Sequence, residues 1–372
     1  FLRKTPWARE KVEGLYLYMR RAQARTERDR FVPVEAPFGS WASPVSADAI
    51  AGASIRLGQL GVLGRDILWT EGRPQEQGRN ALVWRSDDGR VQDLTPAPLN
   101  VRSRVHEYGG GAFKLGPRAG FIVNDADQQI WRLRAGVAPQ ALTALPGMRH
   151  ADIEIDAAHK RLICVREDHT GSGEAVTTLV AVSLANGAER VLVSGADFYA
   201  SPRVSPDGRS LAWLSWDHPD MPWDGTTLWL AELHPDGTLG TPARVAGGAD
   251  ESIFQPSWSP RGELHFVSDR SGWWNLYRRD AEGQVQALHP MAAEFGRPQW
   301  AFATSSYGFD GRGRIVCTFT KDGRSTLAVL DGERLEIIAT PFCAIGELQV
   351  GDDFVVFLGA SETTPESVVR LA

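Results

Sequence analysis

Two stretches of the chain share one pattern: SPRVSPDGRSLAWLSWD at residues 201–217 and QPSWSPRGELHFVSDR at residues 255–270. Each reads as a short strand, a polar turn and an apolar strand that ends near an acidic residue. Related copies bring the total to seven, spaced by about 40–53 residues, the range typical of repeat folds. The other copies are ADIEIDAAHKRLICVRED at 151–168, SSYGFDGRGRIVCTFTKD at 305–322, GQLGVLGRDILWTEGR at 58–73, GGGAFKLGPRAGFIVNDAD at 109–127 and IGELQVGDDFVVFLGAS at 345–361.

This period, with up to four strands in each unit, predicts an all-β fold: a seven-bladed β-propeller of four-stranded antiparallel sheets. Hairpin dipeptides such as Asp207-Gly208 and Asp322-Gly323 separate strands rich in branched and aromatic residues. No alternation of strands with helices indicates a parallel sheet. The seventh copy shows only three strands, so we expect the last blade to be incomplete. The predicted blades are residues 55–96, 101–145, 149–195, 197–248, 251–290, 293–341 and 342–372.

The amino-acid composition argues against some classes of binding partner. The net charge is −6 with no basic stripe, which argues against nucleic acid. No apolar run reaches the ~20 residues that span a bilayer, so we expect no membrane segment. Cys164, Cys317 and Cys343 lack the spacing of a metal site and lie in or beside apolar stretches. They predict buried free thiols in a reducing compartment, the cytoplasm, with the periplasm as the alternative.

The first 30 residues differ from the rest, since they carry nine Lys or Arg and four acidic residues. We therefore divide the chain into a basic arm at residues 1–37, either helical or disordered, and a propeller at residues 38–372. A short helix is predicted over Ser46–Ala51, with Ser46 as the N-cap. The chain begins at Phe1, which indicates a fragment or a processed product.

Motifs of covalent catalysis and cofactor binding are missing from the sequence. It contains no G-x-S-x-G nucleophile elbow, no H-E-x-x-H zinc motif, no P-loop and no dinucleotide fingerprint. The eight histidines do not pair at metal-ligand spacing. We therefore predict no catalytic residue, no metal site and no cofactor in this chain.

Five stretches are more specific than the blade repeat, and together they resemble the propeller of bacterial serine peptidases of the prolyl oligopeptidase family. The resemblance covers about residues 38–372 and is nearest to the dipeptidyl aminopeptidase/acylaminoacyl-peptidase group. RVHEYGGGAF and WDHPDMPWDG carry most of its specificity. The five stretches are VRSRVHEYGGGAF at 101–113, REDH at 166–169, SPDGRSLAWLSWDHPDMPWDGTTLWLAEL at 205–233, VSDRSGWWNLYRRD at 267–280 and FTKDGRSTLAVLD at 319–331.

The resemblance implies a propeller that precedes a C-terminal α/β-hydrolase domain with a Ser-Asp-His triad, covers its active site and admits only short peptides. This sequence ends before such a domain begins, so no triad residue can be carried over. The predicted function is therefore a non-catalytic, substrate-gating propeller whose partners are short peptides and that hydrolase domain. The alternative is a free-standing binding or scaffold propeller. A homo-oligomer stays open, as do the peptide specificity and the choice between endo- and exopeptidase.

Candidate substrate contacts follow from the blade order, because the loop from the second to the third strand and the connection into the next blade share one face. His106, Glu107 and Tyr108 are predicted to begin the innermost strand of blade two, and the REDH segment to end the second strand of blade three. Their carboxylates could bind a peptide's amino terminus, and an arginine could bind a carbonyl or carboxylate. The alternative is inter-blade ion pairs and hairpin caps. The predicted substrate-binding residues are Glu107, Arg166, Glu167, Asp168, His169 and Trp223.

Two further features of this region have a structural interpretation. The three glycines at residues 109–111 are predicted to let the inner strands crowd around the axis, rather than to bind an anion. Four tryptophans could line an aromatic pocket, but packing between blades is the favoured prediction for them: Trp216, Trp223, Trp273 and Trp274. Trp223 lies in the long DHPDMPWDG loop, where an aromatic side chain needs either a packing partner or a ligand.

Overall fold

The computed structural model describes residues 35–41, 43, 45–47 and 54–372. The chain divides between residues 52 and 53, and the second unit holds every strand described below. The predicted arm helix and most of the predicted helix at Ser46–Ala51 lie outside the described residues, so both stay predictions. The same is true of the domain boundary at residue 37.

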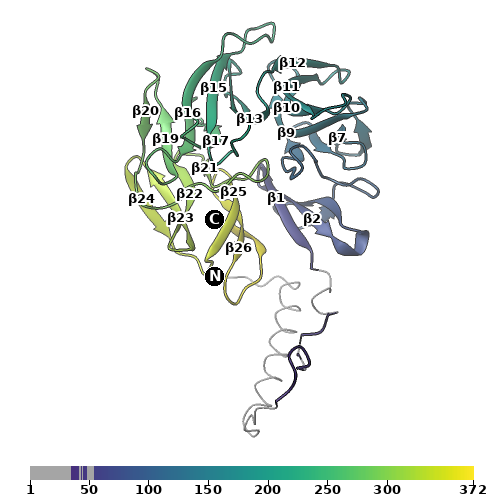
Figure 1. Ribbon diagram of the computed structural model, residues 1–372, viewed down its shortest axis with the longest axis vertical. Coiled ribbons are helices and arrows are strands. Elements are labelled where there is room, and N and C mark those ends of the chain that lie inside the picture. The colour runs from purple at the N-terminus through teal and green to yellow at the C-terminus, as the bar shows by residue number, and fades with distance from the viewer. Residues whose placement is uncertain (1–34, 42, 44, 48–53) are drawn as a thin grey trace. The chain divides into compact units, whose positions relative to one another are not determined.

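Seven antiparallel sheets are arranged in a ring, and neighbouring strands of each sheet follow one another in the chain (Figure 1). Six sheets have four strands and the last has three, which confirms the predicted propeller and its shortened seventh blade. The first three blades are β1 (Arg56–Leu63), β2 (Asp66–Arg73), β3 (Arg79–Arg85) and β4 (Val91–Asp93); β5 (Phe113–Leu115), β6 (Gly120–Val123), β7 (Ile130–Arg134) and β8 (Val137–Ala141); and β9 (Met148–Asp156), β10 (Arg161–Asp168), β11 (Val176–Ser183) and β12 (Glu189–Val193). A 3₁₀ turn, η1 (Pro74–Glu76), lies between β2 and β3.

The remaining four blades occupy the other half of the ring. They are β13 (Phe198–Val204), β14 (Ser210–Trp216), β15 (Thr226–Glu232) and β16 (Ala243–Gly248); β17 (Ile253–Trp258), β18 (Leu264–Ser268), β19 (Asn275–Arg279) and β20 (Val285–Ala287); β21 (Tyr307–Phe309), β22 (Ile315–Lys321), β23 (Arg324–Asp331) and β24 (Arg334–Ile338); and β25 (Ala344–Val350), β26 (Val355–Ala360) and β27 (Ser367–Leu371).

Most innermost strands contain a β-bulge at the same level of the ring. The register shifts within β1, β9, β13, β17 and β25. In four of these strands one bulge residue has a positive φ: 50° at Asp152, 53° at Ser201, 49° at Gln255 and 52° at Glu347. A bulge disrupts the hydrogen bonding of a strand within its own sheet. Here groups at the bulges bond to a neighbouring blade instead. Ser201 N donates to Asp152 Oδ2 over 2.6 Å, and Ser306 N donates to Gln255 Oε1 over 2.7 Å.

Apolar side chains fill the space between neighbouring blades, because the apolar residues of the strands face the adjoining sheets. The ring closes between blades 1 and 7 in the same way, because Leu60, Ile67 and Trp69 pack against Phe354 and Val356. Exposed ion pairs flank this contact, with Arg65 Nη1 2.9 Å from Asp353. Among the described residues no strand is exchanged between these two blades, so side-chain packing and ion pairs close the ring.

Residues 106–108 correct one prediction. They form turns, and the innermost strand of blade two begins only at Phe113. His106 and Glu107 have consecutive positive φ values of 53° and 61°, which lie outside the β region and interrupt a regular strand. The thiols also differ slightly from expectation, because Cys164 and Cys317 are buried but Cys343 is partly exposed.

Candidate functional site

Two connections between blades meet across the propeller axis. Residues 109–111 lead into β5 of blade 2, and residues 301–303 precede β21 of blade 6. Phe302 N donates to Gly109 O over 2.9 Å, and Gly110 pairs with Phe302 as an isolated parallel bridge. Blades 2 and 6 are not neighbours in the ring, so this pairing joins distant blades. We refer to residues 109–111 and 301–303 together as the clasp.

The three glycines are what make the clasp possible. Their φ values are 67°, 88° and 53°, a region that other residues rarely adopt. A Cβ on Gly109 would lie 2.1 Å from Ser103 O, and one on Gly110 would lie 2.5 Å from Phe302 O. A Cβ on Gly111 would lie 2.8 Å from the backbone of Asp152 in β9. The predicted crowding is therefore confirmed at Gly111, whereas Gly110 makes room for the opposite connection.

A cavity of about 840 Å³ lies against the clasp. The loop between β10 and β11, the loop between β14 and β15 and the connections before β5, β13 and β21 supply its walls. Four of the six predicted site residues line it together: Glu107, Glu167, His169 and Trp223. Arg166 and Asp168 do not line it.

The strand period explains why Arg166 and Asp168 are separated from Glu167, since alternate residues of β10 face opposite sides of the sheet. Arg166 Nη1 lies 3.1 Å from Glu189 Oε2, and His150 Nε2 lies 2.7 Å from the other oxygen of that carboxylate. Asp168 Oδ1 accepts hydrogen bonds from the amide and hydroxyl of Thr170, and these bonds lower the pKa of Asp168. Asp168 thus caps a loop, as the alternative interpretation named, whereas the ion pair of Arg166 lies within blade 3 and not between blades.

Glu167 links blade 3 to the segment before β5, which contains residues 109–111 of the clasp. Its buried carboxylate accepts a hydrogen bond from His106 N over 2.7 Å, and its other oxygen lies 2.8 Å from His169 Nε2. Both carboxylate oxygens are therefore engaged. Glu167 fixes the backbone of His106 in its unusual conformation and leaves little capacity for a ligand.

Glu107 has the opposite character. Its side chain is 83% exposed, and its only ion pair among the described residues is with Arg149 Nη1 at 3.2 Å. An exposed pair of this kind contributes little to stability, and water or a ligand can replace it at small cost. Glu107 is the predicted residue best placed to meet a charged ligand.

Aromatic rings form much of the cavity wall. Trp223 lies 4.5 Å from Trp300 between ring centroids, and Tyr108 lies 5.1 Å from the same Trp300. Trp223 thus has an aromatic packing partner and also lines the cavity. Trp216 and Trp274 are buried as predicted, while Trp273 is 43% exposed.

A second aromatic group surrounds His106. Its ring centroid lies 5.1 Å from Phe198, 5.5 Å from Trp216 and 4.8 Å from Phe302. Burial lowers the pKa of His106 to about 3, so the imidazole is neutral near pH 7. The sequence did not single out Phe198, Trp300 and Phe302, although all three are aromatic residues in or next to connections between blades.

The charges around the cavity have one sign. Five carboxylates line it, and among the residues that the structure describes neither Lys nor Arg does. The lining histidines are His106, His169 and His218, and His218 Nδ1 lies 3.0 Å from the lining carboxylate of Asp197. The five carboxylates belong to Glu107, Glu167, Glu174, Asp197 and Asp220.

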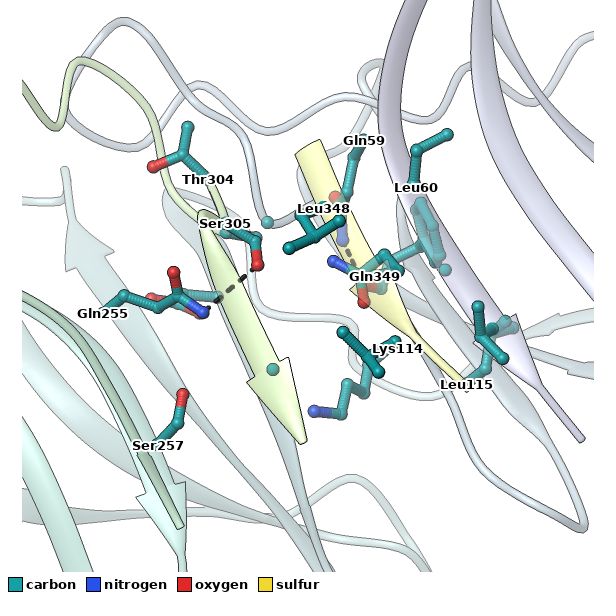
Figure 2. A pocket seen from close by; sticks show the side chains of 18 of the residues that line it. Gln59, Leu60, Lys114, Leu115, Gln255, Ser257, Thr304, Ser305, Leu348 and Gln349 are labelled. Carbon is teal, nitrogen blue, oxygen red and sulfur yellow. Dashed lines mark hydrogen bonds between the residues drawn. The ribbon is translucent and has the colours of Figure 1, made fainter. Parts of the chain in front are cut away.

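The axial channel lies on the other side of the clasp. Gly111 and Ala303 line the channel, whereas Gly109 and Phe302 line the cavity. The channel encloses about 310 Å³, and all seven inner strands contribute to its wall. Figure 2 shows Gln255 bonded to Ser305 on one side of it, with Gln59, Lys114 and Gln349 on the other.

Polar groups in the channel are mostly bonded to one another. Gln59 Nε2 donates to Phe113 O over 3.0 Å, and Lys114 Nζ lies 2.6 Å from Glu154. Arg203 Nη1 lies 3.2 Å from Asp152. Such mutual pairing is typical of structural polar groups, since burial without a partner is costly.

Two negative findings concern the described part of the chain. It contains no group of three or more His, Cys, Asp or Glu side chains arranged to hold a metal ion. None of its helices has the length and hydropathy needed to cross a membrane. The predicted compartment stays untested.

Several solved structures are similar to this chain. A puromycin-hydrolysing peptidase from Mycobacterium tuberculosis is 35% identical, covers 91% of this chain and has a TM-score of 0.84. A puromycin hydrolase is 34% identical with the same coverage and TM-score. Prolyl oligopeptidase B from Galerina marginata, 11% identical over 85% of this chain with a TM-score of 0.61, shares the fold. No protein-family model and no curated protein matches the chain.

This chain spans 55% of the length of the two puromycin-hydrolysing relatives and 48% of the Galerina enzyme. The part that it matches is their propeller. The family resemblance inferred from the sequence motifs is thereby confirmed, while the dipeptidyl aminopeptidase/acylaminoacyl-peptidase subtype stays a prediction. The chain is a seven-bladed β-propeller, homologous to the propeller portion of puromycin hydrolase and similar to that of prolyl oligopeptidase family peptidases.

Proposed function

We propose that this chain is the substrate-selecting propeller of a serine peptidase, and that its acidic cavity receives the amino-terminal end of a short peptide. A hydrolase domain of the same protein would supply the chemistry. The observation that carries this proposal is a cavity lined by five carboxylates and, among the described residues, by no Lys or Arg. The names of the relatives, which are peptide or puromycin hydrolases, support the assignment to a peptidase.

The charge distribution favours a cationic group at the rim. A free α-amino group is protonated at neutral pH, and ammonium–carboxylate hydrogen bonds are stronger than neutral ones. Glu107 and Glu174 are exposed in the loops that form the rim, and Glu107 has only the weak pair with Arg149. The buried Glu167 instead serves as a positioning residue for His106.

The dimensions of the cavity favour short ligands. Pockets that enclose small ligands measure about 300–1,000 Å³, and a cavity of about 840 Å³ is large enough for a few residues of peptide. The clasp stands between this cavity and the axial channel, so a long chain has no continuation in that direction. Selection of short peptides would follow from this closed end.

Amino-terminal recognition also separates the two activities suggested by the sequence motifs. A dipeptidyl aminopeptidase needs a free amino group on its substrate, whereas an acylaminoacyl-peptidase takes a blocked one. An acidic rim favours the free amine and hence the first activity.

The test is peptide binding to the chain of residues 1–372, measured by calorimetry or tryptophan fluorescence. We expect Ala-Ala amide with a free amino terminus to bind at least tenfold more tightly than its acetylated form. Glu107→Gln should reduce that preference severalfold. Glu282→Gln is the matched control, because Glu282 is exposed in the hairpin between β19 and β20, away from the cavity.

Equal affinity for free and acetylated peptides would contradict amino-terminal recognition. Binding of neither peptide would contradict the substrate-selecting function and favour the alternative of a scaffold propeller.

A further inference from the structure

The inner end of the cavity differs from its acidic rim. His106, Phe198, Trp216 and Phe302 meet there, with the ring of His106 in contact with the other three. These side chains come from the connection before β5, from β13, from β14 and from the clasp. Trp216 is 8% exposed and Phe302 is 5% exposed, so only part of each ring faces the cavity.

His106 is held firmly, yet its own polar group is unused. Glu167 accepts its backbone N–H over 2.7 Å, and three aromatic rings confine the imidazole. Its Nε2 atom is buried and has no hydrogen-bond partner. Buried polar atoms are nearly always bonded, so an unbonded one in the wall of a cavity indicates a place where a ligand atom can bind.

We propose that this inner end is a subsite for an aromatic side chain of the bound peptide, with His106 as its specificity-determining residue. The inference rests on the proposed peptide-binding function and adds the chemical class of the substrate. Edges and faces of the surrounding rings suit another aromatic ring, because aromatic pairs prefer edge-to-face and offset contacts. The imidazole completes the subsite with one neutral hydrogen-bonding atom.

The main competitor for an aromatic wall is a cation, which also binds to ring faces. A cation would also gain from a free carboxylate nearby. Asp197, next to Phe198 in the chain, is bonded to His218 N and Nδ1. The carboxylate that bonds His106 belongs to Glu167. Both oxygens of that group are already engaged, by His106 N and by His169. Glu107, which is mostly exposed, lies at the rim. The inner end therefore favours an uncharged ring, while the rim favours the ammonium group.

The test compares four dipeptide amides with free amino termini on the same chain of residues 1–372: Ala-Ala, Phe-Ala, Ala-Phe and Ala-Lys. We expect one of the two Phe peptides to bind about tenfold more tightly than Ala-Ala, an effect typical of burying an aromatic side chain. Ala-Lys should show no gain over Ala-Ala.

Variants assign the effect to the subsite. His106→Asn removes the ring and keeps a residue type that tolerates a positive φ, so the preference for Phe should fall to within about twofold. Phe198→Leu, which thins the aromatic wall and leaves the clasp intact, should also reduce the preference if the His106 variant does not fold. His234→Asn is the control, because His234 is 42% exposed and does not line the cavity.

The outcomes separate the two proposals. Equal affinity for the Phe peptides and Ala-Ala, or a preference for Ala-Lys, would overturn the aromatic subsite and leave the peptide-binding function standing. A preference for Phe that survives both His106→Asn and Phe198→Leu would also overturn it. Binding of none of the four peptides would overturn both proposals.

Discussion

The cavity and the axial channel share the clasp as a wall, yet their polar groups differ. In the channel, amides and charges from neighbouring blades bond one another, as Gln255 does with Ser305 and Arg203 with Asp152. One channel hydroxyl, Thr304 Oγ1, has no partner. In the cavity, His106 Nε2 has no partner and Glu107 has only an exposed one. The difference suggests that polar residues of the channel hold blades together, whereas those of the cavity are available to a ligand.

The strongest test of this difference is Asp152→Ala in the channel. Asp152 is buried, accepts a hydrogen bond from Ser201 N and pairs with Arg203. Removing one partner of a buried pair costs about 3–5 kcal/mol, because the other charge is left uncompensated. We expect a loss of this size in urea unfolding, with unchanged peptide binding in the folded fraction.

Asp168→Ala is the matched change in a carboxylate that only caps a turn, and it should cost less than about 1 kcal/mol. If the two variants lose similar stability, the channel has no special structural role. Loss of peptide binding in folded Asp152→Ala would likewise remove the distinction between the two regions.

A smaller effect is expected from Gly110→Ala in the clasp. Its Cβ would lie 2.5 Å from Phe302 O, and its φ is 88°. Backbone strain and the displaced pairing together should cost about 2–4 kcal/mol. Gly262→Ala is a close control, since Gly262 has a φ of 80° but no atom within 4 Å of its Cβ.

The Gly262 variant should lose about 1 kcal/mol, from backbone strain alone. The difference between the two glycine variants in urea unfolding then measures the close contact across the axis. Equal losses would mean that the clasp contributes nothing to stability.

The smallest expected effect concerns Glu347 in blade 7, at the same bulge position as Asp152 in blade 3. Burial raises the pKa of Glu347 to about 7, with a further increase from Glu366 and a decrease from Arg297. The folded protein then holds a proton that the unfolded chain releases above about pH 4.5. Stability from this group is therefore fully present below about pH 4.5 and is lost as the pH rises to about 7.

Glu347→Gln should remove this loss. We expect the variant to unfold at higher urea than the wild type at pH 8, by about 1–3 kcal/mol, and to differ little at pH 5. A variant that is less stable at pH 8 would show that the Glu347 carboxylate has a stabilising partner, as Asp152 has.

The blades could be predicted because their signals are local. Turn dipeptides such as Asp207-Gly208 and the alternation of apolar residues lie within about 20 residues of one another, and they specify each hairpin independently. The error at residues 106–108 arose because their conformation depends on a distant partner, the Glu167 carboxylate that accepts His106 N, which no short-range pattern contains.

The candidate site was predicted in part for the same reason. Adjacent residues of a strand face opposite sides, so the period of two could have separated Glu167 from Arg166 and Asp168. The ring cluster around His106 had no comparable signal. Phe198 and Phe302 are about 100 residues apart and meet only after the ring closes.

The clasp also changes the connectivity of the ring. Among the described residues, blades 7 and 1 meet through apolar packing and exposed ion pairs without a shared strand, so a ring held by neighbour contacts alone would have its weakest point there. The hydrogen bond from Phe302 N to Gly109 O joins blades 6 and 2, which lie on either side of the contact between blades 7 and 1. Blades 2 to 6 and this hydrogen bond form a closed ring of contacts that does not include the contact between blades 7 and 1. We therefore expect that local opening between blades 7 and 1 would leave the cavity, whose lining comes from residues 106–302, unchanged.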